Sequence, residues 1–215
     1  MKRIHVSTLN LLLLCILSLS ANASPSTLPI YQGIGGNFEM NSTLGNRISL
    51  HNFNDKVVLL SFGYTNCADV CPVTLSFLNS TIKMLKNTGN KVQVIFVSVD
   101  PDYDTPDHMK KFLNYFNSDF IGLSGTREEI DNITALYNIR YSKTSDIQVS
   151  TKYRKLRIIK ENSSPENDTS SLYSHSTLIY LIDFQGRVRA FFDTTTPVEQ
   201  VVHSINLLLQ EKYTE

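Results

Sequence analysis

Two cysteines four residues apart carry the clearest chemical signal in the sequence. Cys67 and Cys71 follow an apolar run over residues 57–62, which predicts a buried strand, and a turn-prone stretch over 63–66. A helical pattern begins near Cys71, so both thiols lie where a strand leads into a helix. Because a helix N-terminus carries partial positive charge and lowers thiol pKa values, this position favours reactive thiolates.

The spacing of the two cysteines limits their chemistry. Positions i and i+4 on a helix place the Cβ atoms about 6 Å apart, whereas a relaxed disulfide needs about 3.8 Å. The first helical turn would have to distort to close a bridge. The wider spacing suits two thiolates that bind a soft ion with metal–sulfur bonds of about 2.3 Å. Thiolates together with an imidazole favour copper or zinc. A structural disulfide and a redox-active pair stay open as alternatives.

A third ligand has to come from elsewhere in the chain, and His175 is the candidate. It opens an apolar run over residues 175–183, which predicts a buried strand, directly after a polar stretch over 162–171. An isolated histidine is weak evidence for a ligand, so a surface or capping role for this side chain also stays open.

Strand and helix patterns alternate around these residues. Strands are expected over residues 38–41 and 48–50 as a hairpin, then over 57–62, 92–99, 120–123, 175–183 and 188–192, and helices over 71–86, 105–116, 126–137 and 197–209. In the 71–86 helix the expected apolar stripe is Val73, Phe77, Ile82 and Leu85.

This order of elements predicts the fold class. It is α/β, a thioredoxin-like fold with a mixed central sheet flanked by helices and an N-terminal hairpin. The cysteines would follow the first core strand. In such a fold the loop that leads to His175 lies beside the cysteine-bearing loop.

The first 23 residues predict a signal peptide. A basic pair is followed by an apolar run over residues 9–19 and by Ala-Asn-Ala at 21–23. The run is shorter than the roughly 20 residues that a membrane span needs. We therefore expect an exported protein, in the periplasm or on the outer face of the cytoplasmic membrane. A signal that is not cleaved would tether the protein to the membrane.

The rest of the chain divides into a linker over residues 24–36, rich in Ser, Pro and Gly, and one domain over 37–215. Removal of residues 1–23 also removes Cys15 and leaves the two motif cysteines in an oxidising compartment. The whole chain has a formal net charge of zero, and the part after residue 23 has a charge of −2. This balance gives no indication of a nucleic-acid partner.

Three motifs together, and in this order, resemble the Sco/SenC family. They are Cys-Ala-Asp-Val-Cys-Pro at 67–72 after Phe-Gly-Tyr-Thr at 62–65, Val-Ser-Val-Asp-Pro at 97–101 with Asp-Thr-Pro at 104–106, and Ala-Leu-Tyr at 135–137 with His-Ser at 175–176 and Tyr-Leu-Ile-Asp at 180–183 before Gly186. The resemblance covers roughly residues 36–213. Members of this family are thioredoxin-fold copper proteins associated with cytochrome c oxidase assembly.

The resemblance implies a copper site and a partner. Cys67, Cys71 and His175 would bind copper as Cu(I) or Cu(II), and the metal would pass to the dinuclear copper site in the copper-bearing subunit of cytochrome c oxidase. The family commonly has an acidic residue just before this histidine, whereas this chain has Ser174. A missing carboxylate would weaken the orientation of the imidazole.

A different class of function uses the same two thiols. In a thiol-disulfide oxidoreductase that acts on other exported proteins, Cys67 would attack and Cys71 would resolve the mixed disulfide, with thiol reductants as further partners. The two activities can coexist, because copper-binding thiols must first be reduced, so whether the protein is an enzyme stays open. A thiol peroxidase ranks last because it leaves the histidine without a role.

Overall fold

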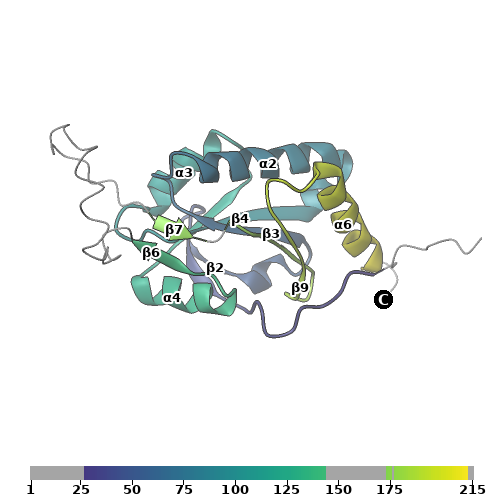
Figure 1. Cartoon of the computed structure of the whole chain (residues 1–215), viewed down its shortest axis with the longest axis horizontal. Helices are drawn as coiled ribbons and strands as arrows, with labels where there is room; N and C mark the ends of the chain where they lie inside the picture. Colours follow the sequence, from purple (N-terminus) through teal and green to yellow (C-terminus); the bar gives the residue numbers. More distant parts are fainter. Residues whose placement is uncertain (1–26, 144–172, 176, 213–215) are drawn as a thin grey trace, which may run out of the picture.

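A mixed seven-stranded sheet with the strand order β2-β1-β5-β4-β3-β8-β9 forms the centre of the molecule (Figure 1). It is seen in a computed structural model that describes residues 27–143, 173–175 and 177–212. In chain order the elements are β1 (Glu39–Ser42), β2 (Arg47–Ser49), η1 (Leu50–Phe53), β3 (Val57–Gly63), α2 (Val70–Leu85), η2 (Lys86–Lys91), β4 (Val92–Ser98), α3 (Pro106–Asn114), β5 (Ile121–Ser124), α4 (Arg127–Leu136), β6 (Tyr141–Lys143), β7 (Tyr173–His175), β8 (Ile179–Ile182), β9 (Val188–Phe192) and α6 (Val198–Glu211).

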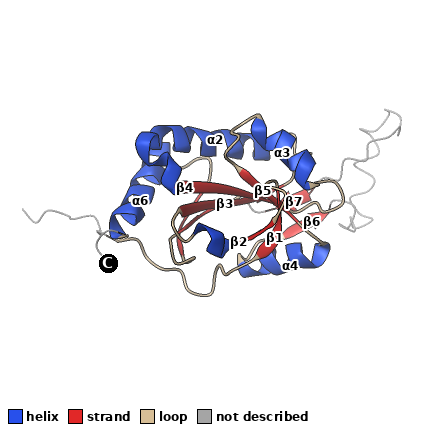
Figure 2. Ribbon diagram, turned by 180° about the vertical axis from the view of Figure 1, so that it is seen from behind, coloured by secondary structure: helices blue, strands red, loops and turns tan. Residues whose placement is uncertain are grey.

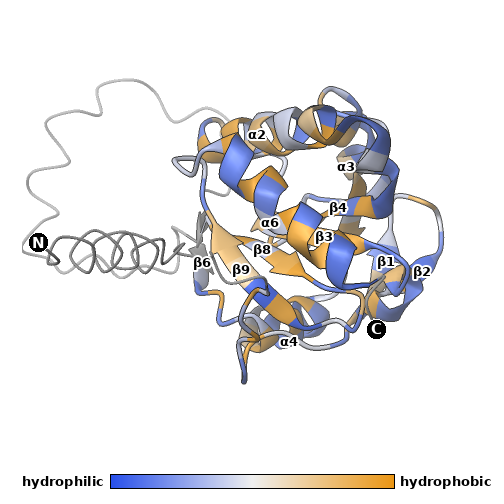
Figure 3. Cartoon of the chain, turned by 90° about the vertical axis from the view of Figure 1, so that its right-hand side faces the viewer, coloured by the Kyte–Doolittle hydropathy of each residue, from blue (hydrophilic) through white to orange (hydrophobic). Residues whose placement is uncertain are grey.

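The two central strands, β3 and β4, are buried along their whole length. They run parallel, with Val57 opposite Val92 and Gly63 opposite Ser98. On the other side of β3 lies the antiparallel strand β8, and beyond β4 lies the parallel strand β5. Near-continuous apolar sequence fits strands that are covered on both faces. Figure 3 shows the apolar residues gathered on the strands and the polar residues on the outer sides of the helices.

Helices cover both faces of this sheet (Figures 1 and 2). Helices α2, α3 and α6 lie on one face and α4 lies on the other. On the first face the ring of Phe96 lies 6.3 Å from that of Phe112 on α3. On the second face Tyr137, which follows α4, packs 5.8 Å from Phe62 and 5.2 Å from Tyr180. The expected α/β, thioredoxin-like arrangement with an N-terminal hairpin is confirmed.

Two of the sequence-based expectations are wrong in detail. Val73 is 51% exposed, while Leu75 and Leu78 are fully buried, so the inner stripe of α2 is rotated from the expected one. The reason is that Cys71 faces the sheet, and positions 75 and 78 share its side of the helix. The expected single strand over 175–183 is also divided. β7 ends at His175 and pairs with β6 in a separate two-stranded sheet, and β8 begins at Ile179.

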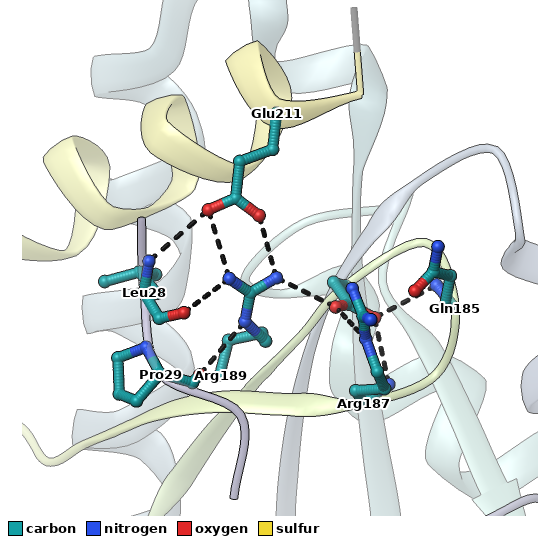
Figure 4. A network of polar contacts seen from close by, with 7 residues as sticks. Leu28, Pro29, Gln185, Arg187, Arg189 and Glu211 are labelled. Carbon is teal, nitrogen blue, oxygen red and sulfur yellow. Dashed lines mark hydrogen bonds and ion pairs between the residues drawn. The ribbon is translucent and has the colours of Figure 1, made fainter. Parts of the chain in front are cut away.

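A polar cluster centred on Arg189 lies at the end of the sheet where β3 begins, called the far end below (Figure 4). The Arg189 side chain is 4% exposed and donates five hydrogen bonds, one for each guanidinium N–H. Two go to Glu211, at 2.8 and 3.0 Å, and one goes to Asp183 at 3.0 Å. The other two go to the carbonyls of Leu28 and Pro29, at 2.5 and 3.0 Å.

These bonds attach the N-terminal segment of the described chain to the domain. Tyr31 adds a backbone hydrogen bond of 3.0 Å to the carbonyl of Val188. Residues 27–36, most of the expected linker, therefore contact the domain, although the boundary at residue 36 stays a prediction. The expected signal peptide over 1–23 and the polar stretch over 162–171 lie outside the described residues. None of the helices in the described part is long and apolar enough to cross a membrane.

Candidate functional site

The two cysteines lie at the carboxyl end of the central strand β3. Cys67 belongs to the cysteine loop, residues 64–69, and Cys71 to the first turn of α2. The loop turns where the N–H of Cys67 donates to the carbonyl of Tyr64 at 3.3 Å. Both cysteines are thiols, 8% and 2% exposed. The strand-to-helix position expected from the sequence is therefore confirmed, and both sulfurs are shielded from bulk solvent.

Gly63, the last residue of β3, makes room for the Cys71 sulfur. A Cβ atom at position 63 would lie 2.7 Å from the Cys71 Sγ and 2.6 Å from the ring of Phe96. Such distances are well below van der Waals contact, so only glycine fits here without movement of the helix or the ring. The sulfur thus lies directly against the strand backbone, which fixes its depth in the molecule.

The electrostatics of the thiol pair differ from the sequence-based expectation of a lowered thiol pKa. The pKa of Cys71 is raised, first by its hydrogen bond with the Cys67 side chain and then by burial, while a hydrogen bond from the Tyr64 backbone acts in the opposite direction. Cys71 is therefore protonated at neutral pH until a bound cation displaces its proton.

A buried carboxyl group, Asp104, holds the cysteine loop in place. Its Oδ2 accepts a hydrogen bond from the Thr65 N–H at 3.0 Å and another from the Ser98 hydroxyl at 2.6 Å, and its Oδ1 accepts a short one from the Thr65 hydroxyl. Asp104 is 2% exposed, and burial raises its pKa despite these donors. Its loop, residues 99–105, is called the acidic loop below. Sequence reasoning placed Asp104 within a motif but gave it no role.

The acidic loop is also bonded to the end of β3, where the Val99 N–H donates to the Gly63 carbonyl at 2.8 Å. Within its own segment the Asp100 N–H donates to the Ser98 hydroxyl at 3.0 Å. Asp100 is fully buried at this strand end. Asp69, in contrast, is exposed at the N-cap of α2, and its side chain makes no cap hydrogen bond. The acidic residue that supports the cysteine loop is therefore Asp104, from the neighbouring strand's loop.

The backbone of His175 reaches the same end of the sheet by a different route. It lies in β7, directly opposite Tyr141 of β6. Four residues later Ile179 pairs with Ser61, two positions before the end of β3. Four residues span at most about 14 Å, so the topology keeps His175 near the carboxyl end of β3. β6 and β7 lie away from α6 (Figure 1), and β6 contacts α4 through Tyr141.

Of the three residues singled out from the sequence, the described structure brings two side chains together. Cys67 and Cys71 are adjacent, and within residues whose side chains are described no group of three metal-ligating residues converges. That description does not include the side chain of His175, so its role as a ligand stays a prediction. Strand β6 had no counterpart among the expected elements, because three residues bordering a polar stretch carry too little periodicity to predict a strand.

Comparison with known proteins gives consistent matches over most of the chain. The model of the SCO1/SenC family matches residues 29–210. The chain is 30% identical over 173 residues to protein sco1 of Schizosaccharomyces pombe, a match that covers 80% of this chain and 59% of that protein. It is 29% identical over 182 residues to SCO2-like protein RP587 of Rickettsia prowazekii, covering 82% of this chain and 80% of that protein.

A solved structure extends this likeness to three dimensions. ScoI of Bradyrhizobium japonicum, determined with copper bound, superposes with a TM-score of 0.66 at 30% sequence identity. The match covers 81% of this chain and 99% of that one. The sheet and helices of this chain thus have a known architecture.

Proposed function

Because the chain belongs to the SCO1/SenC family, we propose that it binds copper and serves the assembly of cytochrome c oxidase. The Sco family is one of cytochrome c oxidase assembly proteins, and its solved members include copper-bound structures. The observation that supports this function most strongly is the pair of adjacent, buried thiols at the end of β3.

The donor set fits copper as cargo. Two thiolates from Cys67 and Cys71 with the imidazole of His175 form a soft ligand set, which selects Cu(I) over harder cations. The low exposure of both sulfurs, 8% and 2%, protects a bound Cu(I) from water and oxidants. Since thiolates and not thiols are the ligands, binding releases protons, and the metal takes over the role of the proton in neutralising the sulfurs.

The chain's other residues position these ligands. Gly63 lets the Cys71 sulfur lie against β3, and Asp104 holds the cysteine loop through Thr65. The copper-bearing subunit of cytochrome c oxidase is the proposed acceptor, which receives copper or has its own thiols reduced by the same pair. We place the protein outside the cytoplasm, in the periplasm or on the outer face of the cytoplasmic membrane, on the basis of the expected signal at residues 1–23.

A Cu(I) titration against a competing chelator tests this function. The reduced protein should bind one copper per chain, and Cys67→Ser or Cys71→Ser should abolish competitive binding. His175→Ala should weaken binding by about tenfold or more. The matched control is His203→Ala, which changes an exposed histidine on α6 and should leave binding unchanged. Wild-type affinity in the His175→Ala variant would remove this residue from the site.

The alternative function, thiol-disulfide oxidoreduction, has a distinct result in the same experiment. If the reduced protein fails to compete for Cu(I), and if Cys67 and Cys71 form a readily reducible disulfide, the oxidoreductase replaces the copper protein. The burial and the raised pKa of Cys71 argue against Cys71 as the attacking thiol, because the thiolate is the nucleophile. Cys67 would then have to be the attacking residue.

A further inference from the structure

The strand that carries His175 needs support from outside its own sheet. β6 and β7 pair over three residues each and do not join the seven-stranded sheet. An isolated two-stranded pair is marginally stable in water. Besides the four-residue connection to β8, the described support of the His175 backbone is this ladder, in which it lies opposite Tyr141 of β6.

Side chains from α4 hold β6 at Tyr141. The Arg127 guanidinium donates a hydrogen bond of 3.2 Å to the Tyr141 hydroxyl and lies 5.7 Å from the centre of its ring. The hydroxyl in turn donates a short hydrogen bond to Asp131 Oδ1. Arg127 and Asp131 are four residues apart, so they lie on one face of the helix. Burial raises the pKa of Tyr141, which keeps the hydroxyl protonated as a donor.

Helix α4, which provides these contacts, is itself fixed by its N-terminal cap and by buried side chains. Its N-terminus is closed by a capping box, in which the Thr126 hydroxyl accepts from the Glu129 N–H at 3.3 Å and Glu129 Oε2 accepts from the Thr126 N–H at 2.7 Å. Ile130 and Ile133 are buried beneath it. After the helix, the carbonyl of the buried Tyr137 accepts a hydrogen bond of 2.7 Å from the Tyr180 hydroxyl in the sheet. The helix thus cannot shift without disturbing the core.

Arg127 also reaches toward the cysteine side of the site. It lies 3.7 Å from a carboxylate oxygen of Asp102 in the acidic loop. Both side chains are substantially exposed, so this pair adds little stability. The pair does, however, connect α4 to the acidic loop, and Asp104 of that loop is hydrogen-bonded to Thr65 of the cysteine loop. A continuous series of contacts therefore runs from the cysteine loop through the acidic loop and α4 to β6.

We propose that Tyr141 is a positioning residue for the copper site: through its hydroxyl contacts with Arg127 and Asp131 it fixes the β6–β7 pair, and with it His175, relative to the two cysteines. This inference rests on the proposed function, since it concerns how the third copper ligand is held. Tyr141 is not one of the proposed ligands. Its hydroxyl acts through the strand pair alone.

The test removes the hydroxyl and keeps the ring. Tyr141→Phe should lower the Cu(I) affinity of the full chain, by less than the about tenfold that loss of a group bonded directly to a ligand costs. It should also alter the sulfur-to-copper charge-transfer band of the Cu(II)-loaded protein, in the direction seen for His175→Ala. In the metal-free protein, amide hydrogen exchange should accelerate in residues 141–143 and 173–175 and stay unchanged in β3. Asp131→Ala should act in the same direction, whereas Tyr115→Phe, at an 87% exposed tyrosine, should do nothing.

Two readouts separate failure of this inference from failure of the proposed function. Wild-type exchange in residues 173–175 and wild-type copper affinity in Tyr141→Phe would overturn the inference, even if His175→Ala loses copper. If His175→Ala binds copper like wild type, the proposed ligand set fails instead. In that case hydrogen exchange still tests whether the Tyr141 hydroxyl anchors the β6–β7 pair. Accelerated exchange in Tyr141→Phe supports this anchoring role, and unchanged exchange refutes it.

Discussion

Opposite ends of the sheet hold buried carboxyl groups in contrasting surroundings. At the far end Asp183 pairs with Arg189 at 3.0 Å and with Arg187 at 2.7 Å, and Glu211 completes the cluster. At the site end Asp104 accepts hydrogen bonds from hydroxyl and amide groups, and no Lys or Arg in the described ranges forms an ion pair with it. One end is neutralised by cations of the chain itself, and the other is not.

This difference separates a structural cluster from a functional one. A buried guanidinium whose five N–H groups are all bonded has no capacity left to bind anything else. Its role is to join α6, β9 and the segment at Leu28 and Pro29. The site end combines a buried carboxyl group with two buried thiols, which would become thiolates on metal binding. A bound cation there supplies the positive charge that the chain does not.

The largest loss of stability is expected from removing the Arg189 side chain at the far end of the sheet. Arg189→Met removes the buried guanidinium from Asp183 and Glu211 and leaves Asp183 with Arg187 alone, and loss of one member of a buried ion pair costs about 3–5 kcal/mol. Urea unfolding should show this loss in the free energy of unfolding, while the Cu(I) affinity of the folded protein stays unchanged. Arg47→Met is the control, because its pairs with Glu39 and Glu129 are exposed and their loss should matter much less. Equal losses in the two variants would show that the cluster is not a structural clamp.

A smaller loss of stability, but with a functional signature, is expected at the site end. In Gly63→Ala the new methyl group meets the Cys71 sulfur and the Phe96 ring, and overpacking of this kind costs about 1–3 kcal/mol. Gly122→Ala is the matched control in β5, where a Cβ would lie 2.8–2.9 Å from Thr43, Leu113 and Met109. Both variants should unfold at lower urea concentration, but only Gly63→Ala should bind Cu(I) more weakly. A parallel loss of affinity in Gly122→Ala would mean that the effect is general destabilisation.

The smallest expected effect is a change in pH dependence at Asp104. Burial places its folded-state pKa above the ordinary value of 3.8, so the folded protein binds this proton more tightly than the unfolded chain. Wild-type stability therefore falls as the pH rises from about 3.8 through the folded pKa. An asparagine can accept from the Thr65 N–H and donate to the Thr65 hydroxyl, and it does not titrate. Relative to wild type, Asp104→Asn should gain stability as the pH rises.

Urea midpoints measured at several pH values between 4 and 8 check this difference. The control is Ser76→Ala, an exposed position on α2, whose urea midpoint should follow that of wild type at every pH. Parallel pH curves for wild type and Asp104→Asn would show that the carboxyl group does not titrate abnormally. The contrast between the two ends of the sheet would then rest on the ion pairs alone.

Much of the fold could be predicted because the central elements have strong periodicity. The apolar runs of β3 and β4 and the Thr105-Pro106 start of α3 mark their own boundaries. The phase of α2 could not be predicted, because four apolar residues fit a stripe that includes Val73. What decides is the space left by Gly63, which admits the Cys71 sulfur and turns that side of the helix inward.

The site was predicted only as far as local sequence determines it. The strand-to-helix position of Cys67 and Cys71 follows from an apolar run, a turn and a helical pattern. The raised pKa of Cys71 does not, since it depends on burial and on contact with Cys67. The support from Asp104 and Tyr141 was also missed, because each acts through residues distant in sequence, 39 positions away for Thr65 and 14 and 10 positions away for Arg127 and Asp131.

The most direct test of the copper site is X-ray absorption spectroscopy of the Cu(I)-loaded chain. The proposed ligand set predicts two sulfur neighbours and one nitrogen neighbour per copper in the wild type. His175→Ala should retain both sulfur neighbours and lose the nitrogen. A wild-type spectrum with sulfur neighbours alone, unchanged by His175→Ala, would contradict the three-ligand site and leave Cys67 and Cys71 as the only protein ligands.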